Sequence, residues 1–186
     1  MTTAPSPASP ARDRYAMPLL VALLVGCLVA LVLGLYARLH HPTGFALDIV
    51  GFSSALYAKA WLTTFATAFA VVQVVTGRRA GKQGAASWIA PLHRSSGRIA
   101  VLLTVPVVVH CIYALGFQTY STRVLIHSVL GCFFYGAFVA KMLSLTWRES
   151  MPRWAVPVLG GTVFLGLIGV WLTSSLWLFT RKGWHF

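Results

Sequence analysis

Acidic side chains are almost absent from this chain of 186 residues. Asp13, Asp48 and Glu149 stand against 15 Lys and Arg residues, and charged residues of either sign make up only 10% of the sequence. Soluble globular domains carry roughly 25% charged residues, so this composition excludes that class. Hydrophobic residues reach 58% and the mean hydropathy is +0.76. The chain is therefore predicted to be an integral membrane protein in contact with the lipid bilayer.

Cysteine motifs and nucleotide-binding motifs are also missing. Cys27, Cys111 and Cys132 lie inside apolar runs with no CxxC or CxxCH spacing, which indicates packing residues instead of a disulfide frame, a zinc site or a c-type haem attachment. No nicotinamide or flavin motif is present. A net charge of +12 raises the question of nucleic acid. However, the basic residues lie at the ends of apolar segments, where they set topology and contact lipid headgroups, so we expect no nucleic-acid partner.

Five apolar segments are each long enough to cross a bilayer as a helix. These predicted spans are residues 17–37, 58–76, 99–117, 124–145 and 155–179. The expected fold class is all-α, an integral membrane bundle of five transmembrane helices over residues 17–179. Residues 1–16 are predicted to form a disordered cytoplasmic N-terminus, because their first part is rich in Pro, Ser and Thr, and residues 180–186 a short outer tail.

Basic residues in the loops predict the direction of the spans. With the N-terminus in the cytoplasm, ten Lys and Arg residues fall inside and five outside, which favours an N-in, C-out arrangement under the positive-inside rule. The first span is too long for a signal peptide and has no A-x-A site after it, so we interpret it as an uncleaved anchor. We expect a multi-pass protein of the bacterial inner membrane.

Two of the six histidines fall at membrane depth. His110 lies roughly 10 Å of helix rise before the outer end of its span, and His127 lies about 5 Å inside the outer end of the next span. The connection between these spans is so short that we expect antiparallel neighbours with both imidazoles at nearly one depth. A six-coordinate haem requires two axial nitrogens on opposite sides of the ring. We therefore predict one haem b with His110 and His127 as ligands of its iron.

Neighbouring residues suit a haem slot. Gly131 lies on the same helical face as His127, where a missing side chain would let a flat macrocycle approach the backbone. Pro106 can bend the span of His110 and open space. Arg123 at the outer edge is predicted to pair with haem propionates.

Other chemistries remain open for these histidines. Each imidazole could instead form a hydrogen bond within the bundle, for example with Ser128 or Ser144. A transition-metal site is less expected, because two histidines without a nearby carboxylate or cysteine cannot complete a tetrahedral or octahedral shell. A proton relay would lack the intramembrane Asp or Glu that such chains usually carry.

The segment 91–143, PLHRSSGRIAVLLTVPVVVHCIYALGFQTYSTRVLIHSVLGCFFYGAFVAKML, resembles transmembrane haem cytochromes of the cytochrome b561 and ferric-reductase-like superfamilies. The resembling elements are HRxxGR from His93, the mid-span His110, and HxxxG at His127 and Gly131. The whole chain is also similar to small five-span actinobacterial membrane proteins. The cytochrome resemblance implies two haems.

The residues themselves support only one haem. In the ferric-reductase pattern the two inner ligand positions would fall on Ser96 and Lys141, and neither is a histidine. His93 is the remaining candidate ligand for a second haem. It lies seventeen residues before His110, which places it roughly a quarter turn off that helical face. The simpler interpretation is that His93 marks the cytoplasmic start of the span and contacts lipid phosphate.

The predicted function is a membrane-integral b-type cytochrome, an oxidoreductase or electron-transfer component. It would pass electrons between a quinol or membrane carrier and an acceptor at the outer face, with a quinone or redox protein as partner. The alternative is a non-catalytic membrane subunit or scaffold beside a respiratory or transport complex. This alternative is motivated by a small-residue stripe in span five that could also form an oligomer, at Thr162, Gly166, Gly169 and Thr173. A transporter is less expected, since no inverted repeat is visible.

Overall fold

The computed structural model describes residues 10–44, 53–80 and 82–185, and within them every regular element is helical. The long helices are α1 (Pro10–Leu39), α2 (Ala55–Ala80), α3 (Ile89–His110), α4 (Thr122–Thr146) and α5 (Ala155–Trp171), followed by the short α6 (Trp177–Lys182). Two π-helical turns, Cys111–Leu115 and Leu172–Leu176, extend α3 and join α5 to α6, and a 3-10 turn occupies Arg148–Ser150. Five helical segments are long and apolar enough to cross a membrane. The predicted all-α fold with five spans is confirmed.

The helices extend beyond the apolar segments that predicted them. Helix α1 begins at Pro10, so the last seven residues of the segment predicted to be disordered are helical. Proline is well suited to the first turn of a helix, because its missing N–H is not needed there. Residues 1–9 of that prediction lie outside the described residues.

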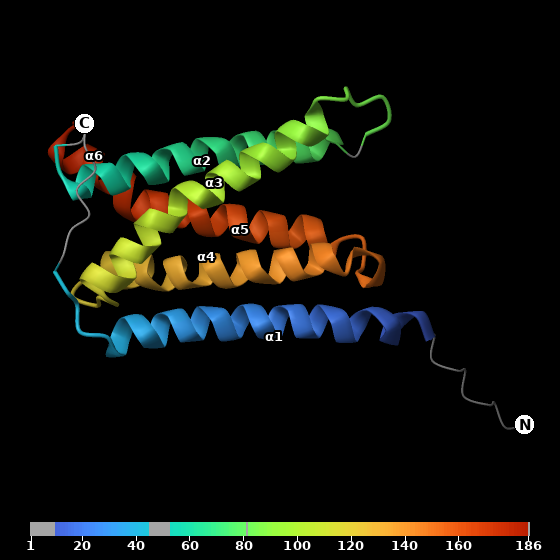
Figure 1. The fold of residues 1–186 in the computed structure, drawn as a ribbon, viewed down its shortest axis with the longest axis horizontal. Coiled ribbons are helices and arrows are strands. Elements are labelled where there is room, and N and C mark those ends of the chain that lie inside the picture. The colour runs from blue at the N-terminus through green and yellow to red at the C-terminus, as the bar shows by residue number, and fades with distance from the viewer. Residues whose placement is uncertain (1–9, 45–52, 81, 186) are drawn as a thin grey trace, which may run out of the picture.

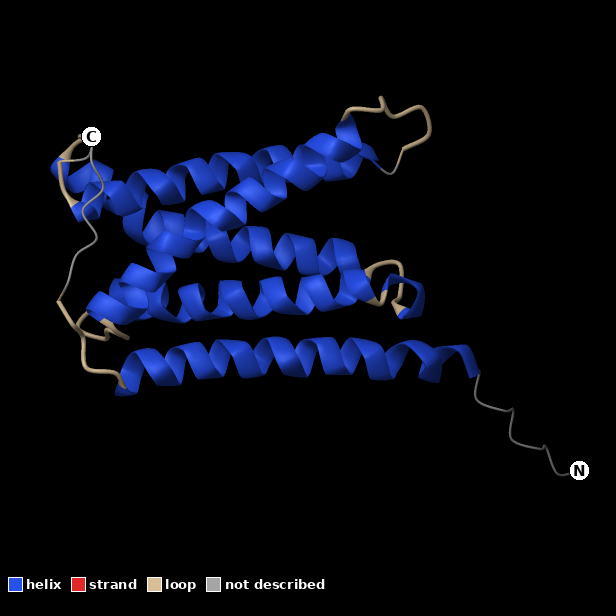
Figure 2. Ribbon diagram, viewed as in Figure 1, coloured by secondary structure: helices blue, strands red, loops and turns tan. Residues whose placement is uncertain are grey.

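The order of the helices in space differs from the order expected from the short loops. Helix α3 packs along α2, whereas α4 lies between α1 and α5 (Figure 1). The short connection after His110 predicts that the spans of His110 and His127 are packed neighbours. Instead α3 runs obliquely and approaches α4 at only one end of the bundle. The loops themselves gather at the two ends of the bundle (Figure 2).

A glycine contact explains why α4 lies against α1. A Cβ built on Gly136 would lie 2.5 Å from the carbonyl oxygen of Gly26, and a Cβ on Gly26 would lie 2.6 Å from the carbonyl oxygen of Gly136. The two backbones therefore touch, as small residues allow in membrane bundles. This contact uses the side of α4 that faces α1, and α3 is left to pack on α2.

The small-residue stripe of span five faces inward. A Cβ on Gly166 would lie 3.5 Å from Phe134, and one on Gly169 would lie 2.7 Å from a methyl group of Leu130, so both glycines pack on α4. Both glycines of the stripe are therefore covered by α4 of the same chain, and an oligomer through span five stays a prediction.

The end of the chain folds back onto α2. The hydroxyl of Tyr57 donates to the carbonyl oxygens of Lys182 and Gly183 at 3.2 and 3.3 Å. The indole of Trp61 donates to the carbonyl oxygen of His185 at 2.8 Å. Residues 182–185 of the predicted outer tail are thus hydrogen-bonded to α2.

The opposite end carries most of the exposed positive charge of the described residues. Its exposed basic side chains are Arg78, Arg79, Lys82, Arg94, Arg98, Arg148 and Arg153. The asymmetry is the one that motivated the N-in, C-out arrangement, which stays a prediction.

Candidate functional site

A cavity of about 380 Å³ lies among α2, α3, α4 and the α5–α6 segment, at the end of the bundle where α3 finishes and α4 begins. This volume falls within the range of small-molecule sites, which runs from roughly 300 to 1,000 Å³. The cavity exists because α3 diverges from α4. The two helices are linked where the hydroxyl of Tyr135 donates to the hydroxyl of Thr104 at 2.8 Å, and both of these residues line the cavity.

Both π-helical turns contribute to the cavity wall. The Gly116 N–H donates to the carbonyl oxygen of Cys111, five residues back, at 2.9 Å, which closes the first π turn. Its residues Cys111 and Ile112 line one side of the cavity, and Ser174 and Ser175 of the second π turn line another. Single π turns inside helices occur frequently at functional sites. The apolar pattern of the sequence carries no signal for either turn.

The chain after α1 stabilises the first π turn. The N–H groups of Thr43 and Gly44 donate to the carbonyl oxygens of Tyr113 and Ala114 at 3.3 and 3.2 Å. The ring of His40 stacks on Tyr113 with 4.9 Å between centroids. These contacts satisfy backbone carbonyls that a π turn leaves without the usual helical donor.

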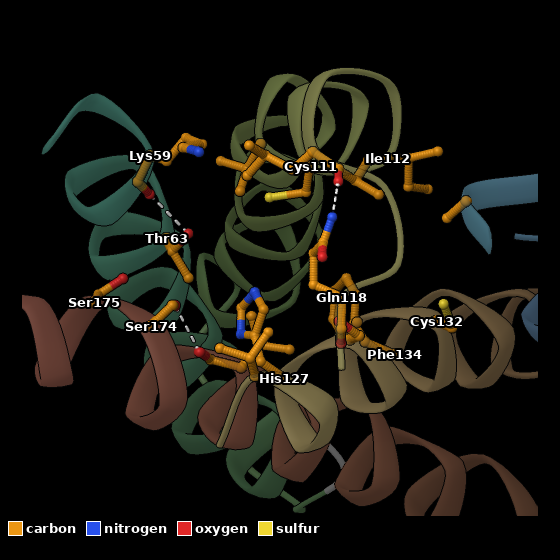
Figure 3. A pocket seen from close by; sticks show the side chains of 18 of the residues that line it. Lys59, Thr63, Cys111, Ile112, Gln118, His127, Cys132, Phe134, Ser174 and Ser175 are labelled. Carbon is orange, nitrogen blue, oxygen red and sulfur yellow. Dashed lines mark hydrogen bonds between the residues drawn. The ribbon is translucent and has the colours of Figure 1, made fainter. Parts of the chain in front are cut away.

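His127 projects from α4 into this cavity (Figure 3). Its Nδ1 lies 3.1 Å from the hydroxyl oxygen of Thr173. That hydroxyl donates its only hydrogen to a backbone carbonyl, with Gly169 as the nearest acceptor at 2.7 Å. With its hydrogen directed to a carbonyl, the Thr173 hydroxyl can accept from His127, and we assign the proton of a neutral imidazole to Nδ1 and the lone pair to Nε2 on that basis. An imidazole fixed in this way through one nitrogen is prepared to bind a metal through the other.

Arg123 lies one turn before His127 on the same wall. Its guanidinium carbon is 3.8 Å from the centroid of the Trp177 ring, and its Nη1 donates to the carbonyl oxygen of Thr173. These contacts fix the cation at the cavity and leave further N–H groups for an anion. Thr173 thus anchors both Arg123 and His127.

Gly131 lies one turn after His127 and also lines the cavity. A Cβ built on Gly131 would meet no atom within 4 Å. The backbone there is open on the face it shares with His127, and the use of this space by a flat ligand stays a prediction. Three of the predicted cofactor-binding residues, His127, Gly131 and Arg123, line one cavity.

His110 is placed differently. It is buried, with 5% of its surface exposed, but it does not line the cavity, whereas its neighbour Cys111 does. His110 is adjacent in sequence to the cavity residue Cys111, as its predicted depth requires. However, α3 packs on α2 and turns a different face, without His110, toward the cavity. Opposite His127 the structure presents Cys111 and Lys59 (Figure 3). The pairing of His110 with His127 stays a prediction.

His93 lies at the other end of α3 and does not line the cavity. Its Nδ1 is 2.9 Å from the carbonyl oxygen of Gln73, and the amide of Gln73 donates to the carbonyl oxygen of His93 at 3.2 Å. His93 therefore connects α3 to α2. Among the described residues, no group of three or more His, Cys, Asp or Glu side chains is placed to hold a metal ion.

Sequence reasoning missed three contributors to the site, Lys59, Thr173 and Ser175. Lys59 had counted only as a topology signal, and Thr173 only as a small packing residue. A polar residue near the end of an apolar span is only a weak indication of a binding site, because the same position also suits a contact with the membrane interface.

The comparisons with known proteins give a family without an activity. No curated protein and no solved structure matches this chain. A family profile matches residues 19–186, a stretch that contains every residue lining the cavity. The chain therefore belongs to the family of unknown function DUF6529.

Proposed function

We propose that this protein is a membrane-integral b-type cytochrome whose cavity takes one haem b, with His127 as an axial ligand. The observation that carries the proposal is the position of the His127 ring, which lines the cavity with its Nδ1 3.1 Å from the Thr173 hydroxyl. With the proton assigned to Nδ1, the Nε2 lone pair would be available to a metal. A fixed ring with a free lone pair is what an axial haem ligand requires.

The neighbours of His127 support the same proposal. Gly131 leaves the backbone of α4 open on the histidine face, and Arg123 provides a cation at the same wall for carboxylate groups. The walls between them are mainly apolar side chains of α3, α4 and α5, as cofactor sites usually are. The resemblance of residues 91–143 to haem cytochromes points to the same class.

Two versions of the proposal differ in the residue that would be the second ligand of the haem iron. The sequence predicts His110, which would face the cavity only if the end of α3 turned by about one residue, or roughly 100°. In the present arrangement Cys111 and Lys59 face His127 instead. Spectra of the His110→Ala, Cys111→Ala and Lys59→Met variants distinguish these versions, because loss of an axial ligand changes the spin state of the haem.

A haem bound here would exchange single electrons at the end of the bundle predicted to face outward. The protein would pass electrons between a quinol or membrane carrier and an acceptor at the outer face. Since the sequence contains no nicotinamide or flavin motif, a soluble donor would be a separate protein. The proposed location is the bacterial inner membrane.

The test is a reduced-minus-oxidised absorption spectrum of the full chain, purified after expression with adequate haem. We expect a b-type spectrum in the wild type and its loss in the His127→Ala variant. His93→Ala is the matched control, because His93 also contacts a neighbouring helix but lies away from the cavity, and it should retain the pigment. A wild-type protein without a haem spectrum would refute the proposal, and so would full pigment in His127→Ala.

A further inference from the structure

The cavity contains a lysine that the haem proposal does not explain. Lys59 lies five residues into α2, is half-buried, and lines the cavity wall opposite His127 (Figure 3). A cation inside a membrane bundle is costly unless an anion or several acceptors surround it. Among the described residues no carboxylate is placed beside Lys59, since Glu149 is exposed at the opposite end of the bundle and Asp13 belongs to the first turn of α1 at that same end. Asp48, in the loop before α2, lies outside the described residues.

A second cation faces the same space from another helix. Arg123 on α4 lines the cavity together with Lys59 on α2. Two cations in a pocket with apolar walls create a positive potential that is weakly screened by solvent. Such a pocket favours an occupant with negative charge.

A buried hydroxyl adds an independent observation. Ser175 is fully buried, and its hydroxyl has no hydrogen-bond partner among the described residues, although it lines the cavity. Four other helical serines, Ser95, Ser96, Ser144 and Ser174, each donate to a carbonyl of their own helix. A buried polar group without a partner calls for an explanation, such as a bound ligand.

We propose that Lys59, together with Ser175 and Arg123, binds a carboxylate group of the apolar molecule that occupies the cavity. The ammonium and the guanidinium supply charge, the Ser175 hydroxyl supplies a neutral donor, and the remaining walls receive an apolar body. Val107, Val108 and Leu167 belong to those walls. This inference rests on the proposed function only where the carboxylate belongs to a porphyrin. A fatty acid carries the same chemistry.

The experiment uses the full chain expressed without added haem and reconstituted in detergent micelles. Metal-free protoporphyrin, which has two carboxylates and no iron, is titrated by its fluorescence, in parallel with its dimethyl ester. Oleate is titrated separately as a fatty-acid probe. We expect an acid probe to bind at least tenfold more tightly than its ester.

The variants assign this preference to Lys59. Lys59→Met should weaken binding of the acid probe about tenfold and leave binding of the ester unchanged, and Lys59→Arg should restore the preference. Lys141→Met is the matched control, because Lys141 is also half-buried but does not line the cavity. It should bind like the wild type.

The outcomes separate this inference from the haem proposal. If oleate binds with the Lys59 dependence while the full chain purified with adequate haem shows no b-type spectrum, the carboxylate site stands and the haem proposal fails. If the porphyrin binds equally as acid and ester, or equally in the wild type and Lys59→Met, the carboxylate site is overturned, and the haem proposal still depends on the absorption spectrum. The absence of binding of both acid probes also overturns the inference.

Discussion

His93 and His127 are held by similar contacts in very different surroundings. The Nδ1 atom of each histidine lies within hydrogen-bond distance of a neighbouring helix, at 2.9 Å from Gln73 and 3.1 Å from Thr173. Beside His93, a Cβ on Gly77 would lie 2.9 Å from the imidazole, whereas a Cβ on Gly131 beside His127 would meet no atom within 4 Å. The space beside the ring, more than the ring itself, distinguishes a structural histidine from a candidate ligand.

The largest effect is expected from filling the open space beside His127. Gly131→Leu places a side chain in the cavity, so we expect complete loss of the haem spectrum. The free energy of unfolding should change by less than about 0.5 kcal/mol, because no existing contact is displaced. Pigment is measured by absorption and stability by unfolding in mixed micelles. Retention of pigment in Gly131→Leu would show that the occupant does not approach α4.

The next effect concerns the acceptor that orients His127. Thr173→Val removes the hydroxyl that accepts from Nδ1, and loss of such an outer-shell partner typically weakens metal binding 10-fold to 100-fold. We expect a shift of that size in a haem titration of the purified apoprotein. Thr162→Val is the control, since Thr162 donates within its own helix and does not line the cavity. Equal haem affinity in both variants would contradict the assigned tautomer.

Overpacking beside His93 is expected to lower stability without affecting haem binding. Gly77→Leu overpacks the contact between Gly77 and the imidazole, so we expect a loss of about 1–3 kcal/mol in the free energy of unfolding. Haem content should remain at the wild-type level in the folded fraction. Loss of haem without loss of stability would place His93 in a ligand site and remove the contrast between the two histidines.

The smallest effect is expected for Thr76→Val. The Thr76 hydroxyl lies 3.3 Å from His93 Nδ1, but the carbonyl oxygen of Gln73 is closer, at 2.9 Å. His93 therefore keeps its main acceptor, and we expect a loss of about 0.5–1 kcal/mol, the net contribution of one hydrogen bond. The measurement is the same unfolding titration. A loss near that of Gly77→Leu would show that the hydroxyl is the main acceptor.

The five spans could be predicted from the sequence, because a long apolar segment in lipid can satisfy its backbone hydrogen bonds by itself only as a helix. The face shared by His127 and Gly131 was also predictable, since residues four apart lie on one side of any helix. These are local properties, and they hold whichever helices become neighbours.

The neighbour of each helix was not predictable in the same way. The short connection after His110 suggested that α3 and α4 pack together, but the contact of Gly26 with Gly136 places α4 beside α1. That choice depends on two residues more than one hundred positions apart. It turned His110 away from the cavity wall and placed Lys59 there, so the helix order decided which side chains the site received.

The π turn at Leu172–Leu176 has one further consequence. Thr173 contacts His127 through its hydroxyl and Arg123 through its carbonyl, while both of those side chains project from α4. One residue of the α5–α6 segment is thus the common partner of the imidazole and of the guanidinium, so a substitution that displaces its backbone is expected to disturb both groups together.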